Sequence, residues 1–398
     1  MTEGDHTYTG RQLVLLHPGA SVDGLHTLRN KAGIRLGSDA DVSGPLTARN
    51  SYRSTHGYLV SGLDFAVTKA DPDQLRALLA TTQERGPIAM VEPERRVRTH
   101  PVQSSETATA ATTDHDQRYL CTWGLAAVGA NTSPFTGRGI RVAVLDTGID
   151  GTHRDMETKH GIAQSFVDGE NSHDHVGHGT HVAGTAVGPR EPNQHPGYGV
   201  APDADLFAGK VIDSAGVGTD GAVLSGISWA VRHRCAVVCL SLGAPVRPGE
   251  PYSTVFEEVA RRATRAGTLI VAAAGNGSRR AEQLAAPVTH PANCPSVMAV
   301  GATNTSTTIA EFSNTTVESY GGAIDVVAPG VDVFSSWLGG YRQLSGTSMA
   351  APHAAGIAAL YAQSTGARGF ELWKTLMSHS RRLNLASRDV GAGLVQAP

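Results

Sequence analysis

Three side chains that can act together in acyl transfer occur in short motifs of this chain. Asp146 lies in Val-Leu-Asp-Thr-Gly, His178 opens His-Gly-Thr-His-Val-Ala-Gly-Thr, and Ser348 lies in Gly-Thr-Ser-Met-Ala-Ala-Pro-His. A serine hydroxyl is a poor nucleophile until an imidazole takes its proton and a carboxylate orients that imidazole. The set predicts covalent catalysis, with Ser348 as nucleophile, His178 as general acid and base, and Asp146 as the group that orients His178.

A fourth polar residue, Asn276, follows an apolar run in Ala-Ala-Ala-Gly-Asn-Gly. Taken alone, Asn-Gly is a turn signal. Beside the other three motifs, its amide could donate to the negatively charged oxygen that forms in acyl transfer, together with the Ser348 backbone N–H. We therefore predict that Asn276 contributes to an oxyanion hole.

Each motif also has a simpler interpretation. Asp146 alone could be a turn residue, and Ser348 alone could cap a helix. His175, His178 and His181 recur every three residues beside Asp174, a spacing that could bind a metal on a helix. Glycines flank the middle histidine, however, and no His-Glu-x-x-His pattern occurs. We expect no metal site there and a structural, hydrogen-bonded role for His181.

The elements that must position these residues are predicted by short apolar runs without polar alternation, which are typical of parallel strands buried on both faces. The runs are 140–145, 206–212, 236–240 and 268–273. Helical stretches at 220–232, at 252–266 and from Ser348 to about Tyr361 lie between or after them. The pattern predicts an open α/β sheet whose site gathers at the carboxyl ends of its strands, where Asp146 and Asn276 fall.

The three motifs closely resemble those of the subtilisin-like (subtilase) serine proteases, in that family's chain order Asp, His, Ser. The resemblance implies an α/β fold with a mostly parallel sheet flanked by helices. It also implies a serine endopeptidase with an Asp-His-Ser triad that acts on protein or peptide substrates. The family's substrate-contacting segments match two loops and an edge in this chain: Ser241, Leu242 and Gly243; Ala274 and Gly275; and Gly216, Val217 and Gly218.

The N-terminal region mixes strand-like runs at 12–16, 57–67 and 88–91 with a helical stretch at 72–83, for which Asp71 is the expected N-cap. This pattern predicts a small α+β domain over residues 1–100. Its end, 90–100, resembles the close of the inhibitor I9-type propeptide of subtilases. That resemblance implies a self-processing zymogen whose own N-terminal propeptide is a partner of the enzyme.

The segment 101–117 is small, polar and non-periodic, which predicts a linker that is open to cleavage. We expect self-cleavage between His100 and Gln117, with a position near His100 favoured. The peptidase domain then spans residues 118–398.

Composition limits the partners and the compartment. A net charge of −3 gives no reason to expect nucleic acid, and no apolar run is long enough to span a membrane. No signal peptide is visible, so we expect a cytoplasmic protein, with export by a non-standard route left open. Cys235 and Cys239 would be about 13 Å apart on one strand, so we expect free thiols.

The sequence requires no cofactor, although Asp150, Asp155 and Asp168 near the triad leave structural calcium open. No twelve-residue calcium loop occurs. Two other functions are compatible with the same motifs: a pseudoprotease that only binds peptides, and a dedicated processing protease that cuts one partner.

Overall fold

The computed structural model describes residues 7–38, 56–83, 85–100, 102–104, 121–157, 159, 161–190, 195–247, 249–317 and 322–398. Its peptidase part is built on a parallel sheet of seven strands in the spatial order β15-β14-β13-β11-β7-β9-β8. Most residues of the inner strands are buried, as expected for a sheet covered on both faces. The predicted α/β class is confirmed. The strands are β7 (Arg141–Asp146), β8 (Gly161–Ser165), β9 (Asp205–Lys210), β11 (Val237–Leu240), β13 (Leu269–Ala273), β14 (Met298–Thr303) and β15 (Val326–Pro329).

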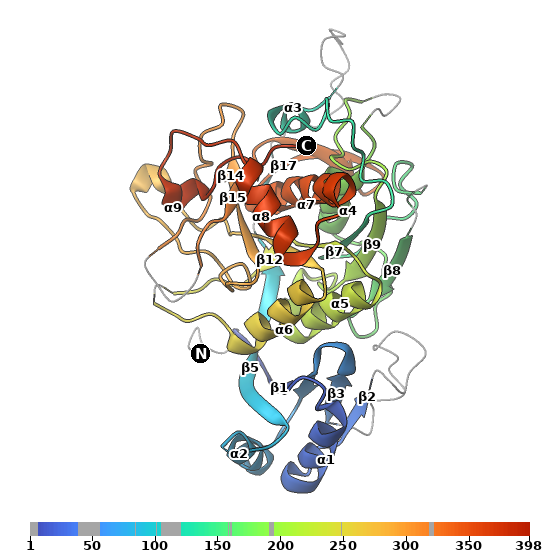
Figure 1. Cartoon of the computed structure of the whole chain (residues 1–398), viewed down its shortest axis with the longest axis vertical. Coiled ribbons are helices and arrows are strands. Elements are labelled where there is room, and N and C mark those ends of the chain that lie inside the picture. Colours follow the sequence, from blue (N-terminus) through green and yellow to red (C-terminus); the bar gives the residue numbers. More distant parts are fainter. Residues whose placement is uncertain are drawn as a thin grey trace.

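Helices cover both faces of this sheet (Figure 1). On one side α4 (His178–Val187) packs against α7 (Thr347–Thr365), and on the other α5 (Asp220–Arg232) packs against α6 (Thr254–Arg265). The helix predicted at 220–232 is confirmed without change. The one predicted at 252–266 begins two residues later, because the Ser253 hydroxyl caps it by accepting from Phe256 N at 3.1 Å. Shorter helices are α3 (Trp123–Ala127), α8 (Gly369–His379) and α9 (Ser387–Val390).

The chain order places the functional motifs at one edge of the sheet. β8 and β9 lie on one side of β7, and the later strands β11, β13, β14 and β15 lie on the other. Asp146 is the last residue of β7, so it stands where the winding of the sheet changes direction, which is where α/β sheets open a crevice. Asn276 lies three residues after the end of β13 at the same, carboxyl edge.

The N-terminal part forms a second sheet with two helices, in the lower half of Figure 1. Strands β5, β1, β4, β3 and β2 lie side by side in that order. Its elements are β1 (Tyr8–Leu16), α1 (Ser21–Ala32), β2 (Leu36–Ser38), β3 (Gly57–Val60), β4 (Phe65–Thr68), α2 (Pro72–Thr81) and β5 (Ile88–Thr99).

The two faces of this N-terminal sheet enter different cores, as the two-residue period of strands requires. Val14 and Leu16 of β1 pack with Leu28 of α1 and Leu78 of α2. The alternating residues Leu13 and Leu15 belong instead to the large core that contains the peptidase strands. The face of the small sheet that carries Leu13 and Leu15 is therefore buried against the peptidase part of the chain.

Two predictions for this region need correction. The run 57–67 is a hairpin and no single strand: β3 and β4 pair antiparallel across a turn at Ser61–Leu63, with Asp64 at φ 53°. A continuous apolar run carries no period that would reveal this turn. Helix α1 was missed, because its N-cap Ala20 makes no side-chain cap and Gly24 interrupts its apolar face. By contrast, α2 begins as predicted, with Asp71 accepting from Asp73 N and Gln74 N.

Most of the predicted linker lies outside the described residues. Within it, Gln103–Ser104 form the short strand β6, which pairs antiparallel with Leu344–Ser345 of β17 (Gly340–Ser345). β17 also pairs with β16 (Val333–Trp337). The linker prediction is therefore wrong at Gln103–Ser104, because backbone pairing with β17 needs no sequence periodicity.

The four cysteines carry free thiols, and those of Cys235, Cys239 and Cys294 are buried. In the part of the chain that the structure describes, no helix is long and apolar enough to cross a membrane.

Candidate active site

Asp146 and His178 are joined directly at the carboxyl edge of the sheet. Asp146 ends β7 and is fully buried, and His178 is the first residue of α4. The Nδ1 atom of His178 lies 2.7 Å from Asp146 Oδ1, which also accepts from Thr147 N at 2.7 Å. This contact leaves Nε2 as the ring atom that can exchange a proton, which is the arrangement a general base requires.

The electrostatics favour a protonatable imidazole. Burial lowers the pKa of His178, but the charge of Asp146 and their hydrogen bond outweigh it, so the pKa is raised overall. The Nε2 atom is buried and has no hydrogen-bond partner among the described residues. It is therefore available to a reacting group.

Ser348 lies in the first turn of α7, which packs against α4. Its hydroxyl donates to the Ser241 carbonyl at 3.3 Å, and the Ser241 hydroxyl donates to the Ser348 carbonyl at 2.8 Å. The Ser348 carbonyl is free for this contact because Pro352, four residues on in α7, has no N–H to donate to it. The structure therefore holds the nucleophile's backbone from the neighbouring strand end, with its hydroxyl turned toward Ser241. Catalytic hydrogen bonds often form fully only with substrate bound.

Asn276 is held beside this helix start. Its Oδ1 accepts from Thr347 N at 2.9 Å and from Thr347 Oγ1 at 2.8 Å, and Thr347 Oγ1 in turn accepts from Gly275 N. The other end of the amide, Nδ2, faces Gly346, where an added Cβ would lie 3.0 Å from it. This is the geometry expected of an oxyanion donor.

If Asn276 donates to the oxyanion, Asn276→Leu should lower kcat about 10²–10³-fold with KM nearly unchanged, a size taken over from the subtilisins. Asn276→Asp is the matched variant, because it keeps the acceptor for Thr347 and loses the N–H donors. It should lose comparable activity in steady-state assays. An Asp variant with normal kcat, or a Leu variant whose main defect is KM, would show a structural role instead.

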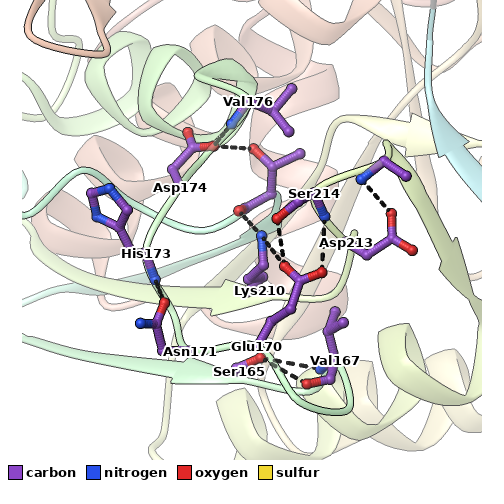
Figure 2. Close-up of polar contacts among 12 residues, drawn as sticks. Ser165, Val167, Glu170, Asn171, His173, Asp174, Val176, Lys210, Asp213 and Ser214 are labelled. Atoms are coloured by element: carbon purple, nitrogen blue, oxygen red, sulfur yellow. Dashed lines mark hydrogen bonds and ion pairs between the residues drawn. The ribbon is translucent and has the colours of Figure 1, made fainter.

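A buried polar network supports the turn after Asp146 (Figure 2). The Thr147 hydroxyl donates to Asp174 at 2.9 Å and accepts from Gly179 N at 2.8 Å. The Thr147 carbonyl accepts from the fully buried Lys210 at 2.7 Å, and Lys210 pairs with Glu170 at 3.2 Å. The network ties the strand that carries Asp146 to the helix that carries His178.

Asp174 is a residue whose role the sequence did not reveal. Its carboxylate accepts from Val176 N, Gly177 N and Thr180 N at the start of α4. Burial raises its pKa, but these hydrogen bonds outweigh burial and the pKa is lowered. Asp174 therefore fixes the beginning of α4, and with it His178. An Asp four residues before the motif was the available signal, although it suggested a metal ligand.

The glycine after His178 explains part of the motif. A Cβ at Gly179 would lie 2.3 Å from the Gly148 carbonyl oxygen, so α4 can approach β7 this closely only with glycine there. His181 is structural, with Nε2 3.1 Å from the carbonyls of both Val333 and Arg342. Burial and the charge of His178 lower its pKa to about 3.

The acidic residues near the triad that could bind calcium have hydrogen-bond partners within the protein. Asp150 accepts from Thr152 N and Gly339 N, and Asp155 accepts from the hydroxyls of Tyr198 and Tyr341. Among the residues that the structure describes, no group of three His, Cys, Asp or Glu side chains could hold a metal ion. Asp150, Asp155 and Asp168 therefore form no such group, and neither do His175, His178 and His181.

The predicted substrate-binding edges lie on either side of β5, a strand of the N-terminal part of this chain. β5 lies between β10 (Val217–Thr219) and β12 (Leu242–Gly243), antiparallel to both. Val217 and Gly218 stand opposite Arg98 and Val97, and Leu242 stands opposite Thr99. Gly216 precedes β10 at φ 78°. Gly275 packs against Thr289, where a Cβ would lie 2.6 Å from Cγ2.

Two other predicted contact residues bond within the peptidase part. The Ser241 hydroxyl donates to the Ser348 carbonyl, and the Ala274 carbonyl accepts from Thr289 N at 2.9 Å. Thr289 was not predicted, because it lies in an irregular segment without a motif.

Comparison with known proteins agrees with this geometry. Residues 137–393 match the model of the subtilase family. The chain belongs to the subtilase family. Over 285 residues, 69% of this chain, it is 40% identical to M-protease of Shouchella clausii and to subtilisin Savinase of Lederbergia lenta, covering 68% and 96% of those proteins. Subtilisin NAT of Bacillus subtilis subsp. natto is 39% identical over 252 residues. This subtilase is a serine endopeptidase that acts on protein or peptide substrates.

Proposed function

We propose that this subtilase is made as a self-processing zymogen whose residues 1–100 occupy its own substrate cleft. The observation that carries the proposal is the placement of Arg96–Thr99 as a strand between β10 and β12. An extended peptide that adds a strand to two exposed edges is a general mode of substrate binding. The segment thus takes the place of the residues that precede a scissile bond.

In the proposed reaction, His178 Nε2 takes the Ser348 hydroxyl proton as Oγ attacks the scissile carbonyl. The oxyanion accepts hydrogen bonds from Asn276 and the Ser348 backbone N–H, and Asp146 stabilises the imidazolium. His178 then gives the proton to the leaving nitrogen, which departs from the acyl-enzyme. Water then attacks the acyl-enzyme while His178 takes its proton, which frees Ser348 and releases the carboxylate product.

Two glutamates of β5 support an inhibitory role for the N-terminal part. Glu94 is fully buried and accepts from Gly221 N at 3.0 Å, at the start of α5. Glu92 accepts from Thr254 N at 2.9 Å and from the Ser253 hydroxyl at 2.6 Å, at the start of α6. Carboxylates are favoured at helix N-termini. These contacts hold the small sheet against the starts of α5 and α6.

The cleavage position stays a prediction, between His100 and Gln117. His100 directly follows the strand that lies between β10 and β12. If that strand is aligned as a substrate, the His100 carbonyl belongs to the scissile bond. The bond after it leads to Pro101, a tertiary amide, and Gln103–Ser104 pair with Leu344–Ser345 of β17, which precede Ser348 in the chain. Cleavage after His100 and cleavage further along the linker give products of different mass.

We expect the purified wild-type chain to split into two fragments that stay associated, whereas Ser348→Ala remains at full length. Glu94→Gln should shorten the lag before activity appears, because it removes the negative charge that pairs with Arg11 and strengthens the contact with Gly221 N at the start of α5. Intact mass, native mass and a time course of peptide hydrolysis measure these results. Exposed Asp73 offers the control Asp73→Asn, which should leave the lag unchanged.

A wild-type chain that stays uncut and is fully active would contradict the zymogen and leave residues 1–100 as a permanent accessory domain. A chain that stays uncut and inactive, like Ser348→Ala, would favour the pseudoprotease.

A further inference from the structure

The side chain of His100 is buried in a pocket close enough to His178 for the two rings to interact electrostatically. It is only 7% exposed, although it lies at the end of a strand that crosses the molecular surface. Its neighbour Thr99 pairs with Leu242, which places the imidazole against the loop that follows Ser241. A Cβ on Gly243 would lie 2.8 Å from His100 Cε1, so the ring takes up the space that a larger residue at position 243 would occupy.

Thr289 forms a polar wall of this pocket. Its Oγ1 lies 3.4 Å from His100 Nε2 and donates its own proton to the Ala274 carbonyl at 3.2 Å. Because that proton is already used, Oγ1 presents a lone pair to the ring. The pocket therefore favours a side chain with an N–H donor at this depth, and Thr289 is itself buried.

The charge state of the ring follows from its surroundings. Burial and the charge of His178 lower the pKa of His100 to about 4, against the hydrogen bonds that the ring makes to the backbone of Ala273 and Leu242. A cationic side chain is disfavoured for the same two reasons. Among uncharged side chains, neutral imidazole combines a flat ring with a single N–H donor, and Thr289 is one of the acceptors that line the pocket at this depth.

We propose that the pocket for the residue before the scissile bond selects a neutral histidine side chain, and that Thr289 is the residue that sets this preference. The inference rests on the proposed function, because the segment ending at His100 is taken to lie in the substrate register. The substrate class is then extended peptides with histidine at the cleavage position, as in this chain's own Val-Arg-Thr-His.

The experiment measures kcat/KM of the self-processed protein on coumarin amides of Arg-Val-Arg-Thr-Xaa, with His, Gln, Phe or Lys as Xaa. Histidine should give the highest value at pH 8. Thr289→Val, which removes the hydroxyl and keeps the shape, should lower the value for His about three- to tenfold, the range of one hydrogen bond. The value for Phe should stay nearly unchanged, and Thr289→Ser should restore the value for His.

A pH series separates recognition from a structural effect of Thr289. Free histidine has a pKa of about 6.5, and the bound ring has a pKa of about 4. The bound form carries fewer protons, so the ratio of His to Gln hydrolysis should fall as the pH drops from about 7 toward about 4. Taking this ratio cancels the titration of His178, because both substrates depend on it equally.

Hydrolysis that prefers Phe or Gln over His, or that Thr289→Val changes equally for every peptide, would overturn the inference and leave the endopeptidase intact. A ratio of His to Gln that does not change with pH would also overturn it. If none of the four peptides is cut and self-processing is absent as well, the proposed function itself fails, and the inference with it.

Discussion

Ser348→Ala and His178→Ala should each lower kcat about 10⁶-fold, and the double variant should lose little more. The size is the one established for the subtilisins, to which this chain is related, and is taken over from them. The physical reason is that attack by Oγ and removal of its proton by Nε2 are one event, so either residue without the other contributes almost nothing. Steady-state hydrolysis of one peptide by all three variants measures the result.

Exposed residues of the same types provide matched controls for these variants. Ser306→Ala and His26→Ala should retain full activity, because both side chains are exposed and neither belongs to a motif. Losses that add in the double variant, or normal turnover in either single variant, would contradict the assignment of Ser348 and His178 as one unit.

Asp146→Asn should lower kcat about 10⁴-fold, as the equivalent change does in other Ser-His-Asp enzymes. An asparagine amide can donate to Nδ1 and so stabilise the wrong tautomer of His178, whereas the carboxylate accepts from Nδ1–H at 2.7 Å. The residual activity should stay well above the uncatalysed rate, because the oxyanion hole is intact. Hydrolysis rates at high enzyme concentration measure this loss, with Ser348→Ala as the baseline for contaminating protease.

The same variant makes a prediction for the pH profile. Only neutral His178 can act as base, so activity falls as pH drops through its pKa. Asp146 raises that pKa by charge and hydrogen bond, and removing the charge should lower it. The acid limb of kcat/KM should therefore move to lower pH in Asp146→Asn. A limb that stays in place or moves to higher pH would contradict the proposed role of Asp146.

Much of the peptidase fold could be predicted from the sequence because its signals are local. Buried parallel strands appear as short apolar runs, and the runs at 140–145 and 236–240 coincide closely with β7 and β11. Asp146, His178 and Ser348 were recognisable because each motif sits at an element end, where backbone geometry restricts the neighbouring residues to small ones such as Gly179.

The features that escaped prediction depend on contacts between distant segments. Nothing near Thr289 indicates that it faces His100, since the two lie 189 positions apart. Gln103–Ser104 become a strand only because β17 offers unpaired backbone groups. The role of Asp174 escaped prediction because it depends on backbone N–H groups at the start of α4, and the sequence does not show that these groups face its carboxylate.

The most direct test of the account is the mass of the protein after incubation with a fluorophosphonate, which forms a covalent bond with an activated serine. After self-processing, we predict one adduct per chain, located on Ser348 by peptide mapping and absent from Ser348→Ala and His178→Ala. An unlabelled wild-type protein, or an adduct that persists when Ser348 is replaced, would contradict the claim that this serine is the nucleophile.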